Sequence, residues 1–170
     1  MNKEEKIRRE LEKAETLIDL GYIETAIERS DIVLELDPEN LDAWIFKGTA
    51  YDRMNELEKG LGCFKNALKI SPRNTKCWDY KGFIEYKLEK YEDSVKSFKK
   101  AIEINNEYEN AYYNLACCYS ILKKKKEALN TLKKLFELNP KNKDEIKREK
   151  DFEWLKDDPE FKELIKKNKD

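Results

Sequence analysis

Histidine is absent from this 170-residue chain, and glycine and proline are scarce. Without histidine, the sequence can contain no Ser-His-Asp or Cys-His catalytic arrangement and no His-ligated zinc or haem. Five Gly and four Pro leave few positions that would break a helix, which favours a helical protein. Carboxylates, lysines, tyrosines and cysteines remain, so composition alone does not exclude catalysis.

Long apolar runs and paired cysteine motifs are also missing. The four cysteines form no Cys-x-x-Cys pair, so we expect no structural zinc site. The longest nearly apolar stretch, Leu115 to Leu122, is far shorter than the ~20 residues that span a bilayer. The charged N-terminus is followed by no apolar segment of a secretory signal. These absences predict a cytoplasmic protein with reduced thiols, no membrane partner, no metal and no cofactor.

Charged residues are abundant instead, and they make up 42% of the chain. A soluble domain usually has about 25%, so this content alone would suggest disorder. However, the chain also contains 9 Tyr, 7 Phe and 3 Trp, and disordered chains are poor in aromatic residues. The composition therefore predicts a folded helical protein.

A period of 34 residues organises most of the chain. Trp44-x-x-x-Gly48 recurs as Trp78-x-x-x-Gly82, and Phe64-x-x-Ala67 recurs as Phe98-x-x-Ala101. The period divides the sequence into the windows 7–40, 41–74, 75–108 and 109–142. Residues 1–6 then extend the first helix, and residues 143–170 form a C-terminal cap.

Small residues recur at the eighth and twentieth positions of every window. They are Ala14, Gly48, Gly82 and Ala116 at the eighth, and Ala26, Gly60, Ser94 and Ala128 at the twentieth. Small residues at fixed places indicate that two backbones approach closely there. Apolar residues at spacings of three and four predict two amphipathic helices per window, over about positions 1–14 and 18–31. Pro38, Pro72 and Pro140 end the second helix of their windows.

This pattern resembles the tetratricopeptide repeat (TPR), a 34-residue helix-turn-helix with Trp, Gly, Tyr, Ala, Phe and Pro at fixed positions. The second window fits best, with Trp44, Gly48, Tyr51, Phe64, Ala67 and Pro72. The pairs Lys47-Gly48 and Lys81-Gly82 are similar to those of prokaryotic arrays. The resemblance implies an all-α, right-handed α-α superhelix of four helix-turn-helix repeats plus C-terminal capping helices.

The last residues leave the period but resemble tails that close many TPR arrays. We expect a cap whose apolar side chains cover the second helix of repeat four: Phe152, Trp154, Leu155, Phe161 and Leu164. Pro159 suits the first turn of a helix, with Asp158 or Asp157 as its N-cap. The alternative is a detachable tail that occupies the groove.

The resemblance also implies where a ligand binds, because the first helix of each repeat lines the concave face. Positions 2, 5, 9, 12 and 13 of that helix supply the contacts. The residues expected to bind a partner are Leu11, Ile18, Ile45, Asp79, Phe83, Tyr86, Lys87, Tyr113, Cys117 and Ile121. Their apolar members concentrate late in the chain, as in a groove for an amphipathic helix or an extended peptide. The alternative for each residue is packing against the neighbouring helix.

Several charged and thiol residues have two interpretations. Glu85 stands where the family prefers Tyr, and it is either paired with Lys81 one turn earlier or a functional acid. The run Lys123–Lys126 is expected to be a solvated turn, with a patch for an acidic partner as the alternative. Cys77 and Cys118 occupy small positions and are expected to be inert core thiols, whereas Cys117 is expected to project toward the groove.

These features predict a non-enzymatic protein–protein interaction module, an adaptor or scaffold with no catalytic residue and no nucleic-acid partner. The positions that clamp a carboxylate in chaperone-binding TPR domains hold Leu11, Glu15, Phe46, Lys76 and Tyr80, which cannot do so. The alternative is a structural unit that forms a homo-oligomer. Residues 1–40 hold 6 basic and 12 acidic side chains, whereas residues 109–142 hold 7 and 3. These opposite charges could meet head to tail.

Overall fold

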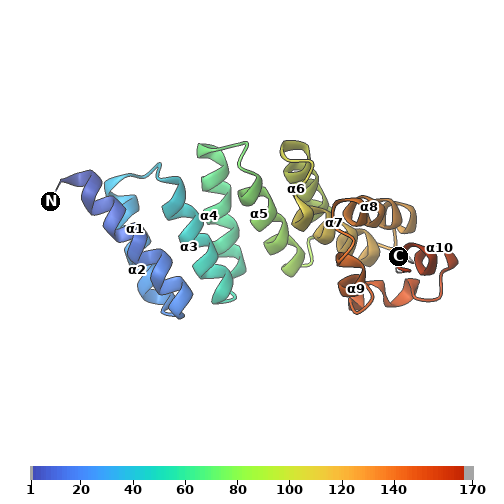
Figure 1. Ribbon diagram of the computed structural model, residues 1–170. Coiled ribbons are helices and arrows are strands. Elements are labelled where there is room, and N and C mark those ends of the chain that lie inside the picture. Colours follow the sequence, from blue (N-terminus) through green and yellow to red (C-terminus); the bar gives the residue numbers. More distant parts are fainter. Residues whose placement is uncertain (1, 167–170) are drawn as a thin grey trace.

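The computed structural model describes residues 2–166, and all regular structure in that range is helical (Figure 1). Eight helices form the repeated part: α1 (Lys3–Leu20), α2 (Ile23–Leu36), α3 (Leu41–Arg53), α4 (Leu57–Ile70), α5 (Thr75–Lys87), α6 (Tyr91–Ile104), α7 (Glu109–Ile121) and α8 (Lys125–Leu138). Three short elements follow: α9 (Asn142–Ile146), the 3-10 helix η1 (Lys150–Leu155) and α10 (Pro159–Leu164). The expected all-α architecture is confirmed.

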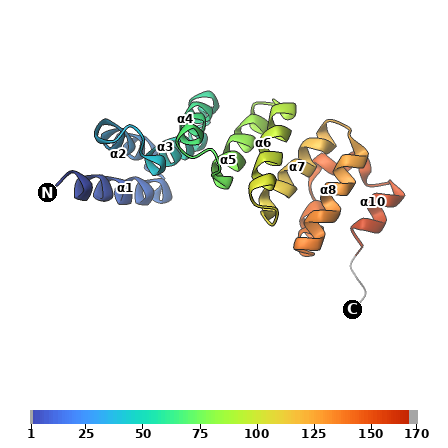
Figure 2. The same cartoon turned by 90° about the horizontal axis from the view of Figure 1, so that it is seen from above.

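The eight long helices form four helix-turn-helix pairs that stack in chain order (Figures 1 and 2). Within each pair the turn contains one residue with a left-handed backbone. These residues are Gly21, Asn55, Glu89 and Lys123, with φ angles of 85°, 59°, 58° and 57°. Glycine adopts this conformation without a steric penalty and asparagine tolerates it, so the local strain lies in the turns of the third and fourth pairs, which contain Glu89 and Lys123.

The close approach predicted for the small residues is confirmed. A Cβ atom added to Gly48 would lie 2.9 Å from the ring of Phe64, and one added to Gly82 would lie 2.8 Å from the ring of Phe98. Ser94, at the twentieth position, donates its hydroxyl to the carbonyl oxygen of Gly82 over 2.7 Å. The first and second helices of repeats two and three therefore cross at these residues, and a larger side chain there would separate them.

In repeats two to four, the aromatic residue near the start of the first helix joins successive repeats. The indole Nε1 of Trp44 donates to the carbonyl oxygen of Pro38, and that of Trp78 donates to the carbonyl oxygen of Pro72, each over 2.9 Å. Tyr112 makes the corresponding hydrogen bond to Asn106 over 3.1 Å. The Trp and Pro periods of the sequence thus describe one interaction that is repeated at each junction.

The odd-numbered helices form the inner layer of the array. Direct contacts connect α1 with α3 and α5 with α7, in addition to the contacts between consecutive helices. Neighbouring repeats are closest on the inside of a curved stack, so this layer lines the concave surface. None of the described helices is both long and apolar enough to cross a membrane.

The three C-terminal elements close the end of the array. The side chains of Phe152, Leu155 and Phe161 are at most 1% exposed and belong to the same apolar cluster as α7 and α8. Pro159 is the first residue of α10, and Asp158 caps that helix by accepting hydrogen bonds from two backbone N–H groups, as expected. α9 and α10 pack against α8, whereas η1 packs against α7.

One part of the expected cap is wrong. Trp154 does not cover the second helix of repeat four: its side chain is 38% exposed, and its indole Nε1 donates to Ser120 Oγ of α7 over 2.8 Å. The cap therefore packs on both helices of the last repeat. It extends onto the inner layer, where the ligand contacts were expected.

Candidate functional site

The C-terminal cap lies across the late part of the concave surface. Ser120 on α7 donates its hydroxyl to the backbone carbonyl of Asp151 over 2.6 Å. Tyr113 on the same helix donates to a carboxylate oxygen of Glu149 over 3.0 Å. Tyr86, one repeat earlier on α5, donates to Oδ2 of Asp151 over 2.6 Å. The segment around residues 149–151 thus crosses α7 and reaches α5.

These contacts involve most of the late apolar residues expected in the groove. Tyr86 and Tyr113 are half-buried, and Cys117 is only 4% exposed. Ile121 lines a shallow pocket together with Asp151 and Trp154. The cap therefore occupies the place that the sequence assigned to a partner, and a role of these residues in partner binding stays a prediction.

The cap is held firmly rather than loosely. Burial of each of its large apolar side chains contributes roughly 1.5–3 kcal/mol. The ammonium group of Lys123 lies 4.5 Å from the centre of the Trp154 ring, and Lys125 forms ion pairs with Asp158 at 2.5 Å and Glu160 at 3.2 Å. The lysine run was expected to be a solvated turn, but these two of its members contact the C-terminal cap, Lys123 through an aromatic ring and Lys125 through two carboxylates.

The thiols and phenols of this region are not activated. Burial raises the pKa of Cys117 well above its ordinary value, and the carboxylates of Asp151 and Glu149 raise it further. Burial also raises the pKa of Cys63, Cys77 and Cys118 to about 11. A nucleophilic cysteine needs a lowered pKa, so none of the four has the environment of a catalytic thiol. Among residues 2–166, no group of three Cys, Asp or Glu is placed to hold a metal ion.

The middle of the inner layer holds the exposed ring of Phe83 and the buried carboxylate of Asp79. Phe83 is 39% exposed, and the ammonium group of Lys87 lies 5.7 Å from the centre of its ring. Lys87 also pairs with Asp52 of the preceding repeat at 2.7 Å. Asp79 is 7% exposed and accepts hydrogen bonds from the Tyr108 hydroxyl and, more distantly, from an amide group. Asp79 therefore lies inside the array rather than on its surface.

Burial raises the pKa of Asp79, and the hydrogen bonds from Tyr108 and Asn114 offset only part of this effect.

Two other expected site residues are also largely internal. Ile18 is 5% exposed within a core cluster, and Ile45 packs against the clusters that join the second repeat to the third. Glu85 is buried and paired with Lys81 at 2.6 Å, so the structure favours the paired interpretation.

The first part of the concave surface is open. A groove of about 430 Å³ lies on α1, the start of α3 and the preceding loop, and we call it the acidic groove. Its lining consists of three apolar residues, five acidic residues and one basic residue: Ile7, Leu11, Phe46, Glu4, Glu12, Glu15, Asp37, Asp42 and Arg8. Leu11 was expected to contact a partner here, whereas Ile7 and Phe46 were not selected from the sequence. Two signals pointed to this surface: the position of Leu11 in the first helix and the excess of acidic residues in the first 40 positions.

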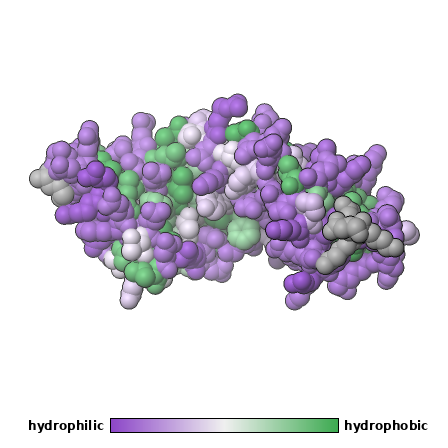
Figure 3. Space-filling view, viewed as in Figure 1, coloured by the Kyte–Doolittle hydropathy of each residue, from purple (hydrophilic) through white to green (hydrophobic). Residues whose placement is uncertain are grey.

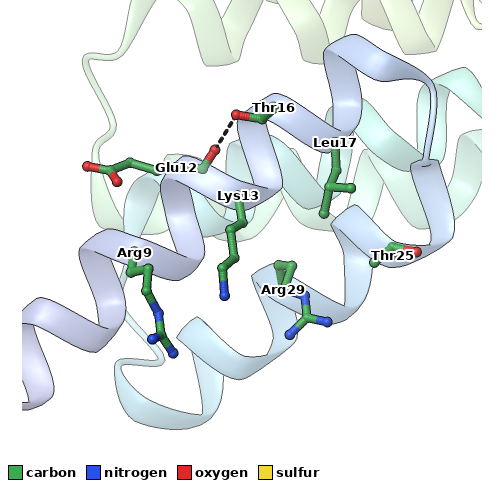
Figure 4. A pocket seen from close by; sticks show the side chains of 7 residues that line it. All are labelled: Arg9, Glu12, Lys13, Thr16, Leu17, Thr25 and Arg29. Carbon is green, nitrogen blue, oxygen red and sulfur yellow. Dashed lines mark hydrogen bonds between the residues drawn. The ribbon is translucent and has the colours of Figure 1, made fainter. Parts of the chain in front are cut away.

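A second cavity, of about 500 Å³, lies between α1 and α2 (Figure 4). Arg9, Lys13 and Arg29 extend into it from the two helices. Glu10, beside it, is 3% exposed and accepts hydrogen bonds from all three cations over 3.1–3.5 Å. Burial alone would raise the pKa of Glu10, but the hydrogen bonds from Lys13 and Arg9 outweigh it and hold the pKa below its usual value.

Comparison with known families identifies the repeats. Models described as tetratricopeptide repeat match residues 41–74 and 109–142, and a model described as TPR repeat matches residues 82–120. Together these matches cover more than half of the chain. The protein belongs to the tetratricopeptide repeat family. A comparison with proteins of curated function found no match.

Solved structures of other TPR proteins share the fold. YrrB, described as a TPR protein with an unusual peptide-binding site, superposes with a TM-score of 0.75 at 20% identity, covering 91% of this chain and 80% of YrrB. MamA from Desulfovibrio magneticus has a TM-score of 0.76 at 16% identity, with 82% and 78% covered. PilF from Pseudomonas aeruginosa has a TM-score of 0.75 at 20% identity, with 85% and 66% covered. At these identities the likeness establishes the TPR superhelix and no shared activity.

Proposed function

We propose that this TPR protein is a non-enzymatic adaptor or scaffold that binds a peptide or an amphipathic helix of another protein on its concave surface. The observation that carries the proposal is the open acidic groove, with Leu11 in its lining, followed along the inner layer by the exposed ring of Phe83. Apolar side chains that remain accessible on an inner helical layer are typical anchors for a bound segment. YrrB, with the same fold, is described as having a peptide-binding site.

The proposal assigns different roles to the ten residues selected from the sequence. Leu11, Phe83 and Lys87 contact the partner directly, because they are accessible on the inner layer. The internal residues Ile18, Ile45 and Asp79 support the surface from below. The remaining four hold the cap and meet a partner only at the cap's edge: Tyr86, Tyr113, Cys117 and Ile121.

Affinity purification from the native cell with a matched pair of variants tests this function. Phe83→Ala removes the exposed ring on the concave surface, whereas Leu138→Ala removes an apolar side chain that is similarly exposed, at 36%, on the outer helix α8. We expect a specific protein to be captured by the wild type and by Leu138→Ala, and lost with Phe83→Ala. Each variant is first shown to be folded by circular dichroism. A partner that is captured equally by both variants would refute the concave-surface proposal.

Self-assembly is the second candidate function, and one feature favours it. The cavity with Arg9, Lys13 and Arg29 lies on the first repeat, while α10 at the other end carries Glu160, whose side chain is paired with Lys125 but still 73% exposed. A head-to-tail contact through a basic fourth repeat is weakened, because Lys125 is already paired with the cap. Light scattering at low and high salt tests assembly, since exposed charge pairs weaken with screening. A monomer at every salt concentration excludes it.

A further inference from the structure

The rim of the acidic groove has an almost uniform sign of charge. Five carboxylates and a single guanidinium line it. Glu4, Glu12, Glu15 and Asp42 form no ion pair with any residue in the described part of the chain. Further along the inner layer, Asp52 is paired with Lys87 and Asp79 accepts a hydrogen bond from Tyr108. The groove therefore gathers several carboxylates without an ion-pair partner at one place on the concave surface.

The fold separates the charges of the first repeat. The cations Arg9, Lys13 and Arg29 surround the buried Glu10 and line the second cavity, between α1 and α2 (Figure 4). They cannot neutralise the groove at the same time. The groove retains only Arg8 as a positive side chain.

The floor of the same groove is apolar. Ile7, Leu11 and Phe46 are partly buried, and Phe46 also packs against a core cluster of α1, α2 and α3. The face in Figure 3 is mostly hydrophilic, with smaller hydrophobic patches that include the N-terminal half. An apolar floor with an acidic rim is complementary to an apolar side chain that is flanked by positive charges. Such complementarity favours one class of partner and repels the opposite class.

We infer that the acidic groove binds a cationic polypeptide segment of the partner protein, with an apolar side chain seated against Ile7, Leu11 and Phe46 and with Lys or Arg on either side. This inference rests on the proposed function and adds the chemistry of the partner. The cations neutralise the unpaired carboxylates, and an acidic segment is rejected by like-charge repulsion. The late part of the surface, closed by the cap, contributes no contact to this segment.

Three fluorescein-labelled peptides of twelve residues test the inference by fluorescence anisotropy with the full chain. The first repeats Lys-Lys-Leu, the second repeats Lys-Lys-Ser, and the third repeats Glu-Glu-Leu. We expect the Lys-Lys-Leu peptide to bind most tightly and its affinity to fall with rising salt. The Lys-Lys-Ser peptide should bind more weakly because it lacks the apolar anchor, and the Glu-Glu-Leu peptide should not bind.

A matched pair of variants locates the binding. Glu15→Gln/Asp42→Asn removes two charges from the groove, whereas Glu28→Gln/Glu35→Gln removes two exposed charges from α2 in the same repeat. The groove variant should weaken binding of the Lys-Lys-Leu peptide about 5- to 10-fold, and the control less than about 2-fold. Because all four positions are accessible, both variants should keep the wild-type unfolding profile. Equal weakening by the two variants would show non-specific charge attraction and overturn the inference.

The remaining outcomes separate this inference from the proposed function. If the Glu-Glu-Leu peptide binds and the Phe83→Ala variant weakens it, the concave surface still binds peptides, but the cationic class is wrong. If no peptide binds, the cationic class is also wrong, while the capture experiment with Phe83→Ala decides the function independently. If the unliganded chain self-associates and the groove variant abolishes this, the occupant is a second copy rather than a partner protein, which also overturns the inference.

Discussion

The hydroxyl of Tyr86 on α5 donates a hydrogen bond of 2.6 Å to Asp151, a residue 65 positions later in the chain. Between the two residues lie the whole of α6, α7, α8 and α9, and the contact passes over the inner side of α7. It fixes the C-terminal cap on the concave surface as well as at the end of the stack. The usable part of that surface is therefore the N-terminal part.

Removing this hydrogen bond should loosen the cap without unfolding the array. Tyr86→Phe deletes only the hydroxyl, and loss of a hydrogen bond to a charged group costs about 1.5–3 kcal/mol. Hydrogen exchange in residues 149–155 should accelerate, because that segment loses one of its anchors. Tyr112→Phe is the control, since its hydroxyl bonds only to the Asn106 carbonyl at a repeat junction. Unchanged exchange in the cap of Tyr86→Phe would contradict the anchoring role.

The close helix crossing at Gly82 should tolerate no added atom. Gly82→Ala places a Cβ 2.8 Å from the fully buried ring of Phe98, and such overpacking costs about 1–3 kcal/mol. Gly62→Ala is the control, because a Cβ there meets no atom within 4 Å and the residue lies within α4. This control should stabilise the protein by about 0.5–1 kcal/mol, since alanine favours the helix. Urea denaturation followed by circular dichroism measures both, and the same sign of change for both variants would contradict the register.

The buried pair of Lys81 and Glu85 should be strongly coupled. Glu85 also accepts a hydrogen bond from Ser97 over 2.6 Å, and both charged side chains are at most 16% exposed. Glu85→Leu leaves the Lys81 ammonium group buried without its carboxylate and should cost about 3–5 kcal/mol. The double variant Lys81→Met/Glu85→Leu should be destabilised much less, because no uncompensated charge remains. With Lys81→Met as the second single variant, additive losses in this double-mutant cycle would show that the two residues act independently.

Asp79 should make the stability of the protein depend on pH. Burial raises the pKa of this carboxyl in the folded state, so the folded chain holds its proton at pH values where the unfolded chain has released it. The contribution of Asp79 to the free energy of unfolding therefore falls as the pH rises through the interval between the two pKa values. Asp79→Asn removes the buried charge and keeps an oxygen that can accept from Tyr108.

The variant should accordingly be more stable than the wild type at neutral pH, and the difference should shrink in acid, at about pH 4 or below. Urea titrations of both proteins at the two pH values measure this difference. A wild type that is more stable than Asp79→Asn at neutral pH would contradict the unfavourable burial of the charge.

Local and periodic features were predictable from the sequence. The spacing of Gly48 and Gly82 predicted the close crossings, and the i, i+4 spacing of Lys81 and Glu85 predicted their ion pair. Asp158 before Pro159 predicted the start of α10. Each of these depends on neighbours within one helix or on the stacking of adjacent repeats. The sequence encodes such contacts directly, because in a solenoid each repeat touches only the next.

The occupancy of the concave surface was decided only by the tertiary structure. Residues 143–166 have no period, so no spacing could show that Asp151 meets Tyr86 or that Trp154 meets Ser120. Nor could the sequence show that three cations of the first repeat gather around Glu10, leaving the carboxylates of the acidic groove unpaired. The sequence alone thus determined the repeats, their helices and their crossings. The tertiary structure decided which part of the concave surface is open. This depends on how the non-repeating tail packs and on the side of α1 to which each charged side chain points, and both are set by contacts between distant parts of the chain.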